Sequence, residues 1–162
     1  MKQYVWMKGY RQLRVGRRSC SGRVYLITSL TMGREPIFAN DSYAQTAIAA
    51  FTAAALLKDN DLLCWVLMPD HAHWLIQLGS HSTLSNLVGS MKSASARHVR
   101  QAGYSNLVWN KGFHDRRLKH NMEIPVAIQY ILDNPYKAGL VERGERYLYS
   151  SGARPPSHWG SR

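Results

Sequence analysis

The order of strand-forming and helix-forming segments predicts an α+β fold, in which an antiparallel sheet carries helices on one face. Three observations predict it. Short β-rich stretches alternate with amphipathic helical stretches along the chain. Two β-rich stretches, 62–68 and 71–78, follow each other with only a tight turn between them, as in a hairpin. A further amphipathic stretch, 122–134, comes after the last strand and predicts an added C-terminal helix.

The first half of the chain begins with a strand over 24–31, where β-branched and aromatic residues roughly alternate with others. Capping residues at 40–42 then begin a helix that ends near Lys58. The unbroken apolar run 62–68 is typical of a strand that is covered on both faces. Strand 71–78 completes the hairpin.

The second half continues with a helix over 83–101, which Gly103 ends. A fourth strand is predicted over 108–118, with an irregular start. The last helix should stop at Asn134, because the residue before Pro135 resists the α conformation. This order, βαββαβ and then a helix, is the ferredoxin-like pattern, and it leaves one face of the sheet open for ligands.

Charge predicts the class of partner. Lys and Arg number 21 against 10 acidic residues, so the chain of 162 residues carries a net charge of +11, which attracts a polyanion such as nucleic acid. The N-terminal stretch mixes cations and aromatics without an acid. We therefore expect a basic arm over 1–23, a body over 24–141 and a polar tail over 142–162, within a single domain.

The two cysteines, Cys20 and Cys64, form no disulfide framework and suit a reducing compartment. The N-terminus lacks the apolar core of a signal peptide, and no apolar run is long enough to cross a membrane. These features predict a cytoplasmic protein with no membrane partner.

His71 and His73 begin the second strand of the hairpin, directly after the turn residues Pro69 and Asp70. Side chains two apart on a strand share a face, so the two imidazoles lie about 6–7 Å apart and can converge on one metal ion. The spacing alone leaves a metal site and a structural pair of histidines equally open.

Tyr130 and Asn134 are one turn apart on the last predicted helix, so they lie on one face of it. Taken alone, they read as a half-buried tyrosine and a helix C-cap. Beside the histidines, they become candidates for one shared site.

The combination resembles the HUH single-tyrosine transposases, and most of all the bacterial REP-associated tyrosine transposases. The matching pieces are MPDHAHWL, WNKGFHDRRL and YILDNPYKAGLV, at 68–75, 109–118 and 130–141, and GRVYLITSLT resembles that family's first strand. The set spans most of residues 22–141. The sequence departs from many relatives at 149–151, where it has Tyr-Ser-Ser in place of Trp-Ser-Ser.

The resemblance implies a role for each matching residue. His71, His73 and Asn134 correspond to the metal ligands, and Tyr130 corresponds to the nucleophile. The implied metal is Mg²⁺ or Mn²⁺. The implied substrate is single-stranded DNA that folds into REP-type, imperfectly palindromic hairpins. The implied reaction is cleavage through a 5′-phosphotyrosine and later rejoining of strands without ATP.

DNA binding should depend mainly on contacts with phosphates. Trp6 and Tyr10 are candidates for stacking on bases, and Asp70 and His114 are candidates for the base that accepts the phenol proton. The candidate phosphate contacts are Arg14, Arg17, Arg18, Arg23, Arg97, Arg100, Lys111, Arg116, Arg117 and Lys137.

Two other functions stay open at this level. His71, His73 and His114 could form a three-histidine zinc site of a metal-dependent nucleic-acid hydrolase. Alternatively, the protein could be a catalytically inactive DNA-binding relative. We favour a monomer over a homodimer, because the sequence shows no clear apolar interface patch.

Overall fold

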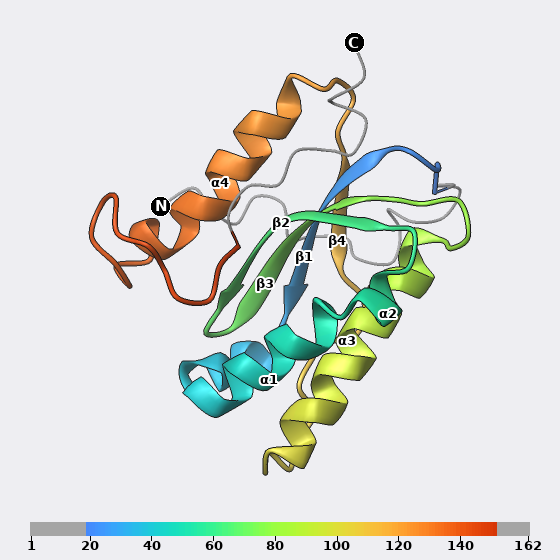
Figure 1. The fold of residues 1–162 in the computed structure, drawn as a ribbon. Coiled ribbons are helices and arrows are strands. Elements are labelled where there is room, and N and C mark those ends of the chain that lie inside the picture. The colour runs from blue at the N-terminus through green and yellow to red at the C-terminus, as the bar shows by residue number, and fades with distance from the viewer. Residues whose placement is uncertain (1–18, 152–162) are drawn as a thin grey trace.

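The computed structural model of the protein describes residues 19–151, which form one sheet flanked by helices (Figure 1). No helix in this part of the chain is long and apolar enough to span a bilayer. In chain order the elements are β1 (Val24–Leu30), the 3₁₀ turns η2 (Met32–Arg34) and η3 (Ile37–Ala39), α1 (Asp41–Phe51), α2 (Ala54–Leu57), β2 (Asp61–Met68), β3 (His71–Gln77), α3 (Leu84–Gln101), β4 (His114–Arg117) and α4 (Glu123–Lys137).

The strands lie in the order β2-β3-β1-β4, and every neighbouring pair is antiparallel. The connection through α1 and α2 therefore leads from β1 to β2 across the intervening β3, which is the split β-α-β arrangement of ferredoxin-like folds. The predicted α+β fold, a ferredoxin-like βαββαβ sheet with an added C-terminal helix, is confirmed.

Apolar side chains are buried on both faces of the sheet. Because side chains alternate along β3, Trp74 and Ile76 join the core beneath α1 and α3. Leu75 points the other way and packs with Ile124 and Ile131 of α4. Thus α1 and α3 cover one face, whereas α4 lies on the opposite face against β2 and β3 (Figure 1).

The helix predicted to end near Lys58 is divided into α1 and α2. Ala53 between them has an extended backbone, with φ −62° and ψ 127°, which no helix can contain. The Thr52 hydroxyl and the Thr52 N–H both donate to the Ile48 carbonyl oxygen, at 2.7 and 3.0 Å, so the last turn of α1 closes just before the break.

The last helix does not stop at Asn134, as predicted, but continues through Pro135 to Lys137. A proline in a helix removes one backbone hydrogen bond. Here Pro135 is buried against the body, and the Ala138 N–H donates to the Asn134 carbonyl oxygen at 3.0 Å. Packing and the bonds on either side therefore outweigh the local preference against helix before a proline.

The fourth strand is shorter than the predicted 108–118. Gly112, with φ +73°, turns the backbone into the left-handed region just before β4. Upstream of it only an isolated bridge between Thr31 and Trp109 continues the pairing. The irregular start expected at 111–112 is thus where regular pairing with β1 is interrupted.

Part of the predicted C-terminal tail pairs with the sheet. The Leu67 N–H donates to the Tyr149 carbonyl oxygen at 2.9 Å, and the Ser151 N–H donates to the Trp65 carbonyl oxygen at 3.0 Å. Residues 149–151 therefore lie along the free side of β2 and are not a separate extended tail. The predicted boundaries of arm, body and tail stay a prediction.

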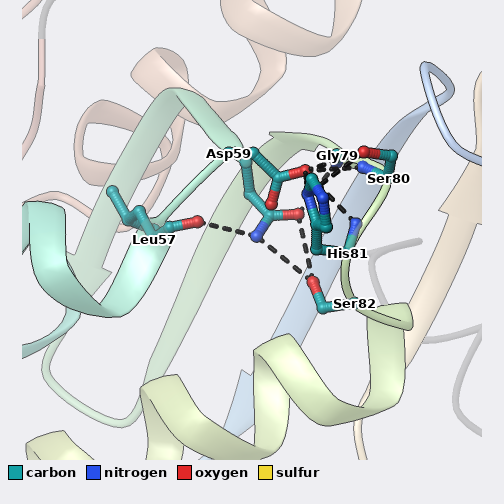
Figure 2. A network of polar contacts seen from close by, with 7 residues as sticks. Leu57, Asp59, Gly79, Ser80, His81 and Ser82 are labelled. Carbon is teal, nitrogen blue, oxygen red and sulfur yellow. Dashed lines mark hydrogen bonds and ion pairs between the residues drawn. The ribbon is translucent and has the colours of Figure 1, made fainter.

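A polar network joins the loop before β2 to the loop after β3 (Figure 2). Asp59 Oδ2 accepts hydrogen bonds from the Ser80 N–H at 2.7 Å and lies 2.8 Å from His81 Nδ1. Gly79 passes so close that a Cβ there would lie 2.5 Å from the Asp59 carbonyl oxygen. The network fixes the end of the hairpin that is farthest from the turn at Asp70.

Candidate active site

His71 and His73 lie on the face of β3 that α4 covers, beside the turn that joins β2 to β3. Each ring is held through its Nδ1 atom. Thr28 Oγ1 lies 2.8 Å from His73 Nδ1, and Asp70 Oδ1 lies 2.7 Å from His71 Nδ1. The two ring centroids are 4.9 Å apart. Nε2 of each ring is therefore the nitrogen that remains for a shared ligand.

The helix α4 brings Tyr130 and Asn134 to these histidines. The Tyr130 ring packs edge-on against His73, with centroids 5.3 Å apart and an angle of 69° between the planes. The Asn134 side chain is buried, and its Nδ2 donates to the Tyr130 carbonyl oxygen at 2.7 Å, which leaves Oδ1 as an acceptor. Tyr130 is 38% exposed, so its hydroxyl can meet a macromolecular substrate.

The electrostatics suit His73 to the role of a metal ligand. Burial lowers the pKa of His73 to about 3, the neighbouring His71 adds to this effect, and a hydrogen bond with Asn134 opposes it. His73 is therefore neutral at physiological pH, and a neutral imidazole is the form that binds metals. Burial raises the pKa of Asp70, but contacts with His71 and Arg34 outweigh it, so the pKa is lowered overall and the carboxylate stays charged.

A pocket of about 370 Å³ opens beside His71. Its polar lining comes from Arg34, Asp70, His71 and Asn134, and its remaining walls are apolar side chains. The two ligand candidates from different elements, a β3 histidine and the α4 amide, thus face one cavity next to the exposed tyrosine.

The predicted phosphate contacts are spread over the molecule. Lys137 lies at the site, with its Nζ 5.7 Å from the Tyr130 ring centroid. Arg97 and Arg100 are exposed on α3, on the other face of the sheet. Arg23, Lys111, Arg116 and Arg117 are exposed on β4 and on the loops before β1 and β4. The predicted residues Arg14, Arg17, Arg18, Trp6 and Tyr10 lie outside the described part of the chain.

Sequence reasoning did not find Thr28 and Arg34. Thr28 reaches His73 only because β1 pairs with β3 in a register that the sequence does not specify. Arg34 follows β1 by four residues, and its guanidinium lies 2.8 Å from Asp70 Oδ2. A polar threonine within an apolar strand was the one available signal, whereas Arg34 offered none.

The three-histidine zinc site is wrong. Thr28 pairs with His73 on one side and with His114 on the other, so these histidines are two strand spacings apart, roughly 10 Å. In residues 19–151 no group of three His, Cys, Asp or Glu side chains could hold a metal.

Known proteins resemble this chain over the region that contains the site. The model of the IS200-like transposase family matches residues 19–134, which include both histidines, Tyr130 and Asn134. The chain belongs to the IS200-like transposase family. No curated protein sequence matches this transposase significantly.

Two solved structures share the fold of this transposase. A REP-associated tyrosine transposase bound to a REP hairpin is similar with a TM-score of 0.66 and 19% identity, over 89% of this chain and 82% of that one. A protein from Deinococcus radiodurans R1, assigned as a transposase, is similar with a TM-score of 0.53 and 21% identity, over 73% of this chain and 95% of that one.

Proposed function

We propose that this transposase cleaves and rejoins single-stranded DNA, with Tyr130 as the nucleophile and His71, His73 and Asn134 as the ligands of a divalent metal. The observation that carries the proposal is the position of Tyr130, which packs edge-on against His73 while its own helix presents Asn134 to the same histidine. A purely structural tyrosine would have no need of this arrangement.

The residues present suit a metal. Two imidazoles that are oriented by partners on Nδ1, together with an amide oxygen, form a neutral donor set. Mg²⁺ or Mn²⁺ is the expected ion, and imidazole ligands suit Mn²⁺ at least as well as Mg²⁺. When bound, such an ion would polarise a non-bridging oxygen of the scissile phosphate.

Tyr130 Oη would attack phosphorus. The new bond joins Oη to phosphorus, and the bond from phosphorus to the 3′ oxygen breaks, so the products are a 5′-phosphotyrosine and a 3′-hydroxyl. The phenol proton must leave during attack. Asp70 is a poor acceptor for it, because the carboxylate is occupied by His71 and Arg34 and its pKa is lowered. His114 remains the other candidate base.

The retained phosphodiester allows a second 3′-hydroxyl to reverse the reaction, so rejoining needs no ATP. Lys137 beside Tyr130 can contact the phosphate on either side of the cleaved bond.

We propose REP-type hairpins as the substrate, because a REP-associated transposase of the same fold has been solved with a REP hairpin bound. The net charge of +11 suits such a polyanion. We further expect a monomer that acts in the bacterial cytoplasm, on the nucleoid.

The test is to incubate the protein with Mn²⁺ and end-labelled hairpin oligonucleotides from around its own gene, and to resolve the products on a denaturing gel. We expect a protein–DNA adduct that Tyr130→Phe abolishes. Tyr136→Phe is the matched control, because Tyr136 is also exposed on α4 but faces a different pocket. Cleavage that persists in Tyr130→Phe without an adduct would refute the nucleophile. Tight hairpin binding with no cleavage at any metal concentration would favour an inactive DNA-binding relative.

A further inference from the structure

Arg34 occupies an unusual position beside the site. It follows β1 in η2, lines the pocket next to His71, and makes an ion pair in which Nη2 lies 2.8 Å from Asp70 Oδ2. The other carboxylate oxygen of Asp70 lies 2.7 Å from His71 Nδ1. Arg34, Asp70 and His71 therefore form one continuous chain of charge-assisted contacts, which ends at a proposed metal ligand.

The backbone of Arg34 is strained. Its φ is +62°, in the left-handed region that suits glycine, and among the described non-glycine residues only Lys58 shares a positive φ. Such conformations persist where the surrounding structure determines them, and they gather at functional sites. The position keeps a long side chain at a place where glycine would fit the backbone better.

The loop that holds Arg34 is tied to the same turn as Asp70. The Thr31 N–H and its hydroxyl both donate to the Asp70 carbonyl oxygen at 2.9 Å, and the Phe38 N–H donates to the Pro69 carbonyl oxygen at 3.0 Å. The backbone of the turn is thus fixed independently of the ion pair. What the Arg34 guanidinium adds is the orientation and the charge balance of the Asp70 carboxylate.

We propose that Arg34 is a positioning residue for the metal site, which acts through Asp70 on His71. The guanidinium holds Asp70 so that one oxygen accepts from His71 Nδ1, and the ring then presents Nε2 to the ion. It also balances the charge of the Asp70 carboxylate beside the pocket. This inference rests on the proposed function, because it assumes that His71 binds a metal.

The test is Mn²⁺ affinity, measured by the loss of the free-ion electron paramagnetic resonance signal, in the absence of DNA. Arg34→Gly removes the side chain while it suits the positive φ. Because Asp70, the direct partner of His71, remains, we expect Mn²⁺ to bind no more than about tenfold more weakly, the lower end of the loss that follows removal of such a partner. Lys58→Gly is the matched control, because it relieves the other positive φ far from the site, and should leave the affinity unchanged.

A double-mutant cycle separates action through Asp70 from a general effect. We expect Asp70→Asn to weaken Mn²⁺ binding, and Arg34→Gly to weaken it no further in the Asp70→Asn background. Arg34→Lys, which keeps the charge but not the planar fork, should recover part of the affinity.

Unchanged affinity in Arg34→Gly, or an equal loss in Lys58→Gly, would overturn the proposal. So would fully additive losses in the double variant. A wild-type protein that binds no Mn²⁺ would instead refute the proposed metal site itself, and the role of Arg34 with it. Thermal unfolding of each variant identifies any that fails to fold, and Arg34→Lys then serves as the test in place of Arg34→Gly.

Discussion

Substitution of Thr28 tests directly how the His73 ring is held in the site. Its Oγ1 lies 2.8 Å from His73 Nδ1, and His73 is only 3% exposed, so water cannot replace the hydroxyl easily. Thr28→Val preserves the shape of the side chain and opens no cavity, so the change isolates one hydrogen bond. It leaves a buried ring nitrogen without this partner, which typically costs about 1–3 kcal/mol of the free energy of unfolding.

The effect on metal binding should be separate from the effect on stability. Without the hydroxyl, the His73 ring loses the β1 side chain that holds its Nδ1 atom, and loss of such a partner typically weakens metal binding about 10- to 100-fold. The measurements are urea denaturation for stability and Mn²⁺ titration for affinity, on Thr28→Val and on Thr28→Ser.

Thr28→Ser is the control, because it keeps the hydroxyl and loses only a methyl group. We expect it to retain most of the affinity, although it should lose some stability through packing. The reasoning fails if Thr28→Val binds Mn²⁺ as tightly as the wild type, or if both variants lose affinity to the same extent, since the second result would mean that packing and not the hydroxyl matters.

Three further predictions concern other parts of the molecule. Gly79→Ala should lower the free energy of unfolding, measured by urea denaturation, by more than about 2 kcal/mol, because its Cβ would lie 2.5 Å from the Asp59 carbonyl oxygen. Gly89→Ala has open space on α3, so in the same assay it should raise the free energy of unfolding by about 0.5–1 kcal/mol. The His81 ring, with smaller backbone contributions, holds the pKa of Asp59 at about 2, below its ordinary value of 3.8. The Asp59 carboxylate therefore stabilises the fold fully above pH about 4 and stops doing so as the pH falls through about 2. Asp59→Asn should flatten the plot of unfolding free energy against pH over that window. An unchanged slope would contradict the contact between Asp59 and His81. Lys137→Gln should reduce the slope of log affinity against log salt for single-stranded DNA by about 0.7, and an identical slope would exclude a phosphate contact there.

The fold was predictable where patterns are local. The apolar run of β2, the turn at Pro69 and the alternation of β3 specify the hairpin, and the capping threonine at the start of α3 marks the helix boundary within one residue. The errors occurred where tertiary packing overrides a local preference. Pro135 stays helical because it is buried. The first helix, in contrast, is interrupted at Ala53, where the backbone is extended.

The site was predictable only in part, for a related reason. His71, His73, Tyr130 and Asn134 could be paired because their spacing within one strand and one helix follows from local geometry and their combination from the family resemblance. Thr28 and Arg34 come from other segments, and whether they reach the histidines depends on strand register and on a strained loop. Neither the strand register nor the loop conformation can be predicted from a single sequence.

The segment 149–151 makes the two edges of the sheet unequal. It occupies the outer side of β2, so the described part of the sheet offers an open backbone edge only at β4. An open edge invites another strand and, with it, dimers or aggregates. The β4 edge is only four residues long, and it carries the exposed cations Arg116 and Arg117. Such an edge resists pairing with another copy of the protein and tolerates a polyanion.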